Sequence, residues 1–332
     1  MVVPLAAVTR GPRVESAHFG AYAVADAAGA IVLSGGDIDA PAYPRSAVKA
    51  MQALPLLLSG AADRYGLTDE ELALACASHA GEPRHAALAA SMLEKSDCDA
   101  AALECGVHWP FNLDAGRALA AAGEEPSALH NNCSGKHAGF VCTARMHGLA
   151  PAGYVHEDHP VMADVLAAVA AILGVTPDPS RRGIDGCSIP TEAVPLRALA
   201  TGFARFGTGT RLPTDIAAAA ARLRAAVAAH PHAIAGTGRF DTIITEAMGT
   251  AVFLKGGAEG VHCAALPELG LGLAIKAADG ASRAAEVATA ALLAHLLPDT
   301  TKGYETVTSC ADRALTNWNG IEVGRLQGLP GF

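Results

Sequence analysis

The sequence predicts a mixed α/β (α+β) fold in which strands from both ends of the chain form one antiparallel sheet flanked by helices. Two observations lead to this prediction. Short apolar segments separated by turn residues occur near the start and near the end of the chain, and segments with helical periodicity fill the middle. We expect one composite domain over residues 1–332, with a sheet lobe of about 1–45 and 235–332, a mainly helical lobe of about 46–234, and a functional site between the lobes.

Strands are expected first at the start of the chain. Residues 1–13, MVVPLAAVTRGPR, are apolar but lack a basic start and a cleavage site, so we interpret them as a strand rather than a signal peptide. Residues 20–37 alternate around an Asp-Ala-Ala-Gly turn, which predicts a hairpin. Near the end, glycine turns separate short apolar segments, and these predict a three-strand meander over residues 249–257, 259–268 and 271–280.

Helical periodicity dominates the middle of the chain. In the segment 68–78, Thr68 and Glu71 are spaced as a capping box, in which each side chain accepts a hydrogen bond from the backbone N–H of the other residue. Other segments with the same periodicity predict helices over residues 82–95, 135–148, 159–174, 212–230 and 282–297.

Charge and composition exclude several classes of protein. The net charge of -9 argues against a nucleic-acid partner, because neutralising phosphates requires a basic surface, and it fits a soluble protein that acts on small molecules. Gly, Pro and charged residues interrupt every apolar run before it is long enough to cross a membrane. The eight cysteines are scattered without a CxxC pair, which indicates a reducing compartment, so we expect the protein in the cytoplasm.

The segment YPRSAVKA, residues 43–50, places Ser46 three positions before Lys49 and two after a proline. Proline favours the first turn of a helix, and residues three apart share a helix face, so the hydroxyl and the amine can meet. A serine becomes a nucleophile when a base takes its proton, and a lysine acts as that base when burial or another cation lowers its pKa. The segment predicts a nucleophile and base pair, with a solvated helix start as the alternative.

Two later segments extend this pattern. Ser78 and His79 follow the helical segment and precede a glycine-containing turn, and Lys255 ends a predicted strand before two glycines. Serine β-lactamases and penicillin-binding proteins carry an SxxK motif, a second serine and a lysine strand in this chain order. The second serine would relay protons, the second lysine would keep the site cationic, and the glycines would let the strand approach a substrate. The alternative is that Lys255 merely ends a strand at the surface.

Cys133 and Cys187 lie in polar, glycine-containing segments, HNNCSGKHAGF and GIDGCSIPT. Cys133 stands three positions before Lys136 at an expected helix start, where the pKa of a thiol is lowered. Thiolates suit zinc, and an ordinary zinc site would add histidine. Spacing alone leaves open buried packing, a redox pair or a cysteine nucleophile for the two cysteines. The histidines considered as further zinc ligands are His79, His130 and His137.

Several uncommon segments in one order together resemble the rhizobial-type, or class 3, serine–lysine asparaginases. The similarity covers most of the chain, from about Val14 to about Ala284. The segments that carry it are TRGPRVESAHFG, YPRSAVKAMQALP, CASHAGEP, HNNCSGKHAGF, GIDGCSIPT, GTGRFDT and LKGGAEG.

The resemblance implies hydrolysis of L-asparagine to L-aspartate and ammonia, on a fold of the serine β-lactamase and glutaminase type. By motif, Ser46 with Lys49 corresponds to the nucleophile pair, and Ser78 with Lys255 to a second serine–lysine pair. The resemblance also implies a homodimer. Lys276, which precedes AADG, is the alternative to Lys255 as the second lysine, because this chain has Lys-Gly-Gly where the β-lactamase pattern has Lys-Thr-Gly.

The resemblance further implies Zn²⁺ as cofactor, held by Cys133, Lys136 and Cys187 with water, in place of the histidine that spacing suggested. Lysine can ligate only as the neutral amine, so the metal would have to hold Lys136 deprotonated. Asp185 is expected beside both metal and substrate. In this family the zinc is thought to help substrate binding more than to supply a nucleophilic water.

We expect four residues to contact the substrate. Arg45, next to the nucleophile, suits a carboxylate, because a planar guanidinium binds that group in two places, and a surface ion pair is its alternative. Asp185 suits the α-ammonium group. His79 follows Ser78 and Asn132 precedes Cys133, and both are assigned to the substrate site as well.

Two other functions stay open at this point. A related serine–lysine amidohydrolase would act on glutamine or a β-lactam instead of asparagine. A non-catalytic module that binds zinc or a ligand would keep the fold without forming an acyl-enzyme. Two serine–lysine pairs argue against the second alternative, since a binding module does not need them.

Overall fold

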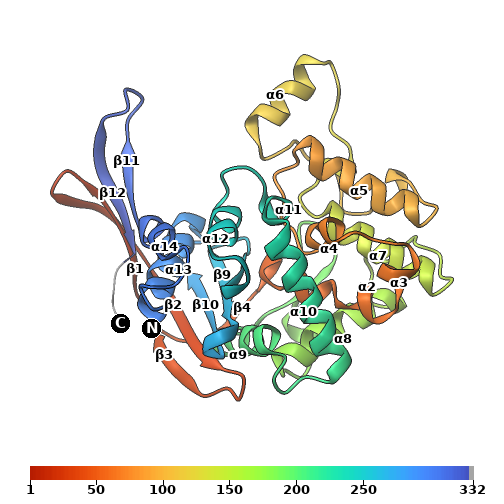
Figure 1. Ribbon diagram of the computed structural model, residues 1–332, viewed down its shortest axis with the longest axis horizontal. Helices are drawn as coiled ribbons and strands as arrows, with labels where there is room; N and C mark the ends of the chain where they lie inside the picture. Colours follow the sequence, from red (N-terminus) through yellow and green to blue (C-terminus); the bar gives the residue numbers. More distant parts are fainter. Residues whose placement is uncertain (329–332) are drawn as a thin grey trace. The chain divides into compact units, whose positions relative to one another are not determined.

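Strands from the two ends of the chain pair in one antiparallel sheet, which confirms the predicted fold class (Figure 1). The computed structural model describes residues 1–328. The chain divides into two units: a sheet unit of Met1–Ala47, Ala193–Thr208 and Ile243–Phe332, and a helical unit of Val48–Glu192 and Gly209–Thr242.

The sheet runs in the order β11-β12-β1-β2-β10-β9-β8, with β3 also paired to β2, and every pair is antiparallel. The expected N-terminal strand, hairpin and C-terminal meander are all part of it. The sequence analysis did not anticipate the last two strands, which form a hairpin of their own. The strands are β1 (Val3–Arg10), β2 (Arg13–Asp26), β3 (Ile31–Gly35), β8 (Phe253–Gly256), β9 (Val261–Leu266), β10 (Leu271–Ala277), β11 (Asp312–Thr316) and β12 (Glu322–Gly328).

Two helices cover the sheet. Helix α9 (Leu196–Thr208) packs on β2, β9 and β10, and α13 (Ser282–Leu296) packs on β1, β9, β10 and β12. The approach of α9 is so close that a Cβ at Gly272 would lie 2.1 Å from the carbonyl oxygen of Ala200, so only glycine fits there. The unit also contains α14 (Tyr304–Ala311), the 3-10 turns Gly249–Ala251 and Pro267–Leu269, and the short pair β4 (Pro41–Ala42) and β7 (Val194–Pro195).

The helical unit is built around α7 (Ser134–Met146), whose residues from Ser134 to Ala144 are all buried. Around α7 pack α2 (Leu54–Leu58), α3 (Ala61–Arg64), α4 (Asp69–Ala75), α5 (Pro83–Lys95) and α8 (Pro160–Leu173). The remaining elements are α1 (Lys49–Gln52), α6 (Leu113–Ala121), α10 (Thr214–Ala229), α11 (Pro231–Ala235), the pair β5 (Arg182–Ile184) and β6 (Pro190–Glu192), and the 3-10 turns Ala100–Ala102, Ala128–His130 and Pro179–Arg181. Helix α12 (Phe240–Met248) runs from the helical unit into the sheet unit.

Local sequence signals set two of these elements. The predicted capping box begins α4: the backbone N–H of Thr68 donates to the Glu71 carboxylate at 2.7 Å, and the backbone N–H of Glu71 donates to the Thr68 hydroxyl at 3.3 Å. Gly135 in the first turn of α7 lets that helix approach α4, because a Cβ there would lie 2.5 Å from the carbonyl oxygen of Leu74. This contact brings the start of α7 against the chain that leads from α4 to Ser78.

Within residues 1–328, no helix is both long enough and apolar enough to cross a membrane.

Candidate active site

Ser46 lies in the 3-10 helix Arg45–Val48, which continues directly into α1 at Lys49. Arg45 begins this turn with a φ of 51°, in the left-handed region that few non-glycine residues adopt. Such backbone strain is concentrated at functional positions in proteins. Ser46 and Lys49 therefore lie three positions apart on an uninterrupted helical backbone, as the sequence predicted.

Lys255 lies in the strand whose end packs against the Ser46 turn. A Cβ at Gly257 would lie 2.7 Å from the carbonyl oxygen of Pro44 and 3.2 Å from the backbone N of Ala47, so a glycine is needed for this approach. The Lys255 side chain is buried, and its Nζ donates to the carbonyl oxygen of Gly256 at 2.7 Å.

Lys276, the alternative to Lys255, occupies a different setting on β10. Its Nζ donates to the carbonyl oxygens of Ala277, at 2.9 Å, and of Glu259. Burial lowers the pKa of Lys276, although Glu259 and Asp279 oppose the shift. The end of the Lys255 strand contacts the Ser46 turn through Gly257, whereas the contacts of the Lys276 amine are with Glu259 and Ala277.

Lys49 is buried with 1% of its surface exposed, and its amine joins two separate segments of the helical unit. The Nζ donates to the carbonyl oxygen of Ala77 at 2.7 Å and to that of Asn132 at 3.2 Å. The amine therefore lies where the residues leading into Ser78 meet the residues leading into the Cys133 segment.

The backbone of Ser78 is hydrogen-bonded to the segment before α12. Its N–H donates to the carbonyl oxygen of Ile234 at 3.0 Å. Its Oγ is buried, and within the part of the chain that the structure describes it has no hydrogen-bond partner. Leaving a buried hydroxyl without a hydrogen bond costs free energy. An unpaired Oγ therefore fits a hydroxyl whose hydrogen-bond partner is a bound substrate.

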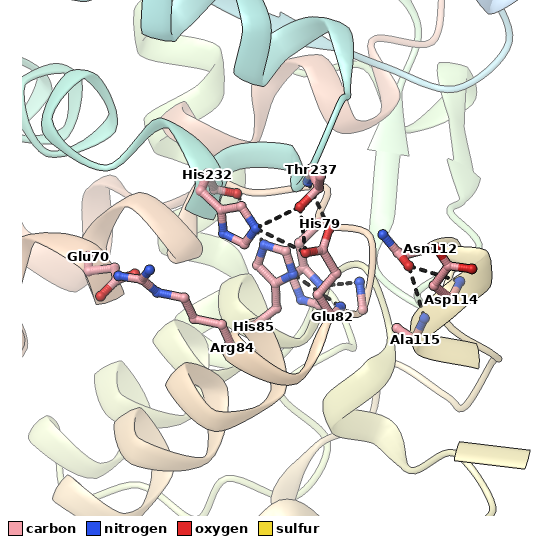
Figure 2. Close-up of polar contacts among 11 residues, drawn as sticks. Glu70, His79, Glu82, Arg84, His85, Asn112, Asp114, Ala115, His232 and Thr237 are labelled. Atoms are coloured by element: carbon pink, nitrogen blue, oxygen red, sulfur yellow. Dashed lines mark hydrogen bonds and ion pairs between the residues drawn. The ribbon is translucent and has the colours of Figure 1, made fainter. Parts of the chain in front are cut away.

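His79, labelled in Figure 2, is fully buried, and its ring links the Ser78 segment to Ser134 of α7. The backbone N–H of Gly81 donates to its Nδ1 at 3.1 Å, so its Nε2–H donates to the Ser134 hydroxyl at 2.9 Å. Burial, with His85 and Lys49 adding to the effect, lowers the pKa of His79 well below its usual value. The ring thus joins the Ser78 segment to the first turn of α7, and its predicted place in the substrate site stays a prediction.

Asn132 is half-buried, and both its backbone carbonyl and its backbone N–H are hydrogen-bonded. Its carbonyl oxygen accepts from Lys49, and its N–H donates to Nε2 of His108 at 3.0 Å. The ring of His108 stacks on Phe111 with centroids 4.6 Å apart, and its Nδ1–H donates to the carbonyl oxygen of Trp109 at 2.7 Å. Sequence reasoning did not find His108, because a single histidine in the segment GVHWPF carries no spacing signal.

The structure brings Cys133, Lys136 and Cys187 together. Nζ of Lys136 lies 3.1 Å from Sγ of Cys187, and a hydrogen bond joins the two cysteine side chains. Cys133 precedes α7 and Lys136 lies in its first turn, whereas Cys187 comes from the turn between β5 and β6. Asp185 belongs to the same turn, where its carboxylate accepts from the backbone N–H of Gly186 at 2.7 Å.

The three groups shift one another's proton affinities. The hydrogen bond with Cys187 holds the pKa of Cys133 well below its usual value, and Lys49 and Lys136 add to this against burial. The same hydrogen bond, together with burial, raises the pKa of Cys187. Burial alone would lower the pKa of Lys136, but Cys187, Cys133 and Asp185 raise it instead. The two thiols and the Lys136 amine therefore form one electrostatically coupled cluster.

Two buried sulfurs and a buried amine that lie together fit a thiophilic ion such as Zn²⁺. Among residues 1–328, no three His, Cys, Asp or Glu side chains gather in a way that could hold a metal, so Lys136 would have to supply the third donor. The histidines considered from spacing are engaged elsewhere. His137 Nδ1 lies 2.7 Å from the Tyr154 hydroxyl, and His130 Nδ1 accepts from the backbone N–H of Ser127 at 3.0 Å.

Comparison with known proteins identifies the family. The sequence profile of the L-asparaginase II family matches residues 6–328. No curated protein sequence gives a significant match.

Solved structures give more distant similarities. A β-lactamase from Mycobacterium bovis matches with 13% identity and a TM-score of 0.42, over 83% of this chain and 94% of that chain. Two structures of Mglu match with 16% and 13% identity and TM-scores of 0.37 and 0.34, over 82% and 87% of this chain. The match spans less than two thirds of each Mglu chain, 63% and 64%. Because the family profile covers nearly the whole sequence, the chain belongs to the L-asparaginase II family and is an asparaginase-type amide hydrolase.

Proposed function

We propose that this protein hydrolyses L-asparagine to L-aspartate and ammonia through an ester formed on Ser46. The observation that carries the proposal is the setting of Lys49. Its amine donates to the carbonyl oxygens of Ala77 and Asn132, and it begins a helix that is continuous with the Ser46 turn. A neutral amine can donate two hydrogen bonds and keep its lone pair, which is then available to accept the proton of Ser46.

In the proposed reaction, Lys49 takes the proton from Oγ of Ser46, and that oxygen attacks the side-chain amide carbon of asparagine. Backbone N–H groups, among them that of Ser46, stabilise the oxyanion of the tetrahedral intermediate. The C–N bond breaks, and the nitrogen leaves as ammonia with a proton relayed through Ser78. Water then cleaves the β-aspartyl ester, releasing aspartate and restoring Ser46. Lys255 keeps the site cationic throughout.

We assign substrate recognition to residues next to these groups. Arg45 precedes the nucleophile and would bind the α-carboxylate, since its planar guanidinium matches that group. Asp185 would accept the α-ammonium group, and Asn132 would line the site through its side-chain amide. We keep His79 as a residue of the same site, where its bonds to Gly81 and Ser134 support the Ser78 segment.

We propose that Cys133, Lys136 and Cys187 hold Zn²⁺. When bound, the ion would offset the thiolate charge and favour substrate binding. Ion binding requires the protons of Cys187 and Lys136 to be released, so apparent zinc affinity should rise with pH.

Replacing Cys187 with alanine should abolish stoichiometric zinc binding and raise KM for asparagine, because it removes one of the two sulfur donors. Metal content measured on the purified variant checks this directly. Cys142→Ala is the matched control. Cys142 is also buried, but it lies in the second half of α7, and its thiol donates to the carbonyl oxygen of Met92 on α5. A Cys187→Ala protein that retains one zinc per chain would refute the metal assignment.

The experiment that tests the function compares three substrates at equal concentration with the purified protein: ammonia release is measured for L-asparagine and L-glutamine, and ring opening, followed by absorbance, for a β-lactam. We expect asparagine to be hydrolysed with the highest kcat/KM. Preference for glutamine would assign the protein to the related amidohydrolase activity. Absence of ammonia from both amino acids, with zinc present, would contradict the proposal and favour the binding-module alternative. Gel filtration of the same sample tests the expected homodimer.

A further inference from the structure

Residues 78–82 run beside residues 234–237 of the same helical unit. At one end of this contact, the Ser78 N–H donates to the carbonyl oxygen of Ile234. In the middle, a Cβ at Gly236 would lie 3.0 Å from the Cβ of Ala80, and Gly236 has a φ of 108° that favours glycine. At the far end, Glu82 contacts Thr237 (Figure 2). We call residues 236–239 the glycine turn; they belong to the GTGRFDT segment, to which the proposed reaction gives no role.

The Glu82 carboxylate joins the two segments with three hydrogen bonds. It accepts from the backbone N–H of Thr237 at 2.8 Å, from the Thr237 hydroxyl at 2.9 Å and from Nε2 of His232 at 3.0 Å. Only 13% of the Glu82 side chain is exposed. Burial by itself raises the pKa of Glu82, but the bonds from Thr237 and His232 lower it below its usual value. Glu82 is therefore an ionised, charge-assisted acceptor, the stronger class of hydrogen bond.

A stack of three histidine rings connects this acceptor to the residue after Ser78. The ring of His85 lies between those of His79 and His232, with centroids 4.9 Å and 4.7 Å apart (Figure 2). The backbone N–H of Glu82 donates to Nδ1 of His85, whose Nε2–H donates to the carbonyl oxygen of His232. The loop from Ser78 to Glu82 is thus held at both of its ends and by the rings packed between them.

This arrangement matters for Ser78 because its Oγ has no hydrogen-bond partner among the described residues. The position of that oxygen is set by the backbone alone, and the backbone is held by Ile234 at Ser78 and by Glu82 four residues later. We propose that Glu82 is a positioning residue for the reaction, which holds the Ser78 loop on the glycine turn and so fixes the Ser78 hydroxyl. The inference rests on the proposed role of Ser78 in relaying the proton to ammonia.

Graded variants test it. Glu82→Met keeps the side-chain length but removes every acceptor, so kcat for asparagine should fall roughly ten- to hundredfold, the loss typical of a displaced catalytic group. KM should change little. Glu82→Gln keeps one carbonyl acceptor, so its kcat should be much closer to the native value than that of Glu82→Met. Thr237→Val removes only the hydroxyl bond, so its kcat should lie between those of Glu82→Gln and the native protein. Glu70→Met is the matched control, since Glu70 pairs with Arg84 at 2.5 Å in the same region and has no contact with the glycine turn (Figure 2).

A double-mutant cycle separates positioning from general destabilisation. If Glu82 acts through Ser78, Glu82→Met should lower kcat in the native background and leave it unchanged in the Ser78→Ala background. Equal losses in both backgrounds, or native kcat in all three graded variants, would overturn the inference. Native turnover by Ser78→Ala alone would instead remove the relay role from the proposed function, so the two failures are distinguishable.

Discussion

Ser46→Ala should lose nearly all turnover of L-asparagine, with kcat reduced roughly 10⁴-fold or more, as when the nucleophile of a serine hydrolase is removed. No other hydroxyl occupies the same turn as Ser46, within the segment Arg45–Val48. Without Oγ the ester cannot form, and the remaining oxyanion and binding contacts supply only residual catalysis. Ammonia release by the native and variant proteins, measured with mass spectrometry of quenched reactions, checks both turnover and the loss of the acyl-enzyme.

The control for this experiment is Ser59→Ala. Ser59 ends α2, and its hydroxyl only accepts a weak bond from the backbone N–H of Ala61 at 3.3 Å, so this variant should keep native kcat. Ser46→Ala should also retain bound zinc, because Ser46 is not among the proposed ligands. Turnover near the native rate in Ser46→Ala would exclude the serine acyl-enzyme while leaving the family assignment intact.

Lys49→Met should reduce kcat by about 10²- to 10⁴-fold, the range typical of a lost general base. Methionine matches the length and apolar stem of lysine but can neither accept the Ser46 proton nor donate to the carbonyl oxygens of Ala77 and Asn132. Two buried acceptors then lose a donor, so the free energy of unfolding should also fall by about 1–3 kcal/mol. Kinetics and urea unfolding of the same preparation measure the two effects.

Lys95→Met is the matched control, because it also replaces a lysine of the helical unit with methionine. Lys95 pairs with Glu71 at 2.6 Å in the same unit but is partly exposed, so its loss should affect stability and leave kcat near the native value. A Lys49→Met protein that keeps native kcat would contradict the assignment of Lys49 as the base.

Local patterns in the sequence were sufficient for much of the fold. Alternation and glycine turns predicted β1 to β3 and β8 to β10, because a strand with one face packed on a helix reads as period two or as a short apolar run. The Thr68–Glu71 capping box formed as predicted, since its two hydrogen bonds depend only on neighbouring residues. The hairpin β11–β12 was missed. Its residues are mostly exposed or half-exposed, so little hydrophobic pattern marks them.

For the candidate site too, the sequence predicted the residues but not the contacts between them. Motif order predicted Ser46, Lys49 and Ser78 as the residues of the proposed reaction, because serine–lysine chemistry requires particular side chains at short spacings. It could not indicate that Lys49 would bridge Ala77 and Asn132, which are far apart in the chain. Spacing also favoured histidine beside the cysteines, whereas the fold places Lys136 against Cys187, 51 positions away.

The amino-acid order alone therefore identified six strands of the sheet, many of the longer helices and the types of chemical group present, because each depends on interactions within a few residues. Tertiary structure decided which of those groups meet. Gly135 and Gly236 permit close backbone approaches. Glu82 and His79 then join segments that are far apart in the chain through hydrogen bonds to Thr237 and Ser134. These contacts follow from packing between distant parts of the chain, where a missing Cβ or a single buried carboxylate determines what fits, and no local pattern records them.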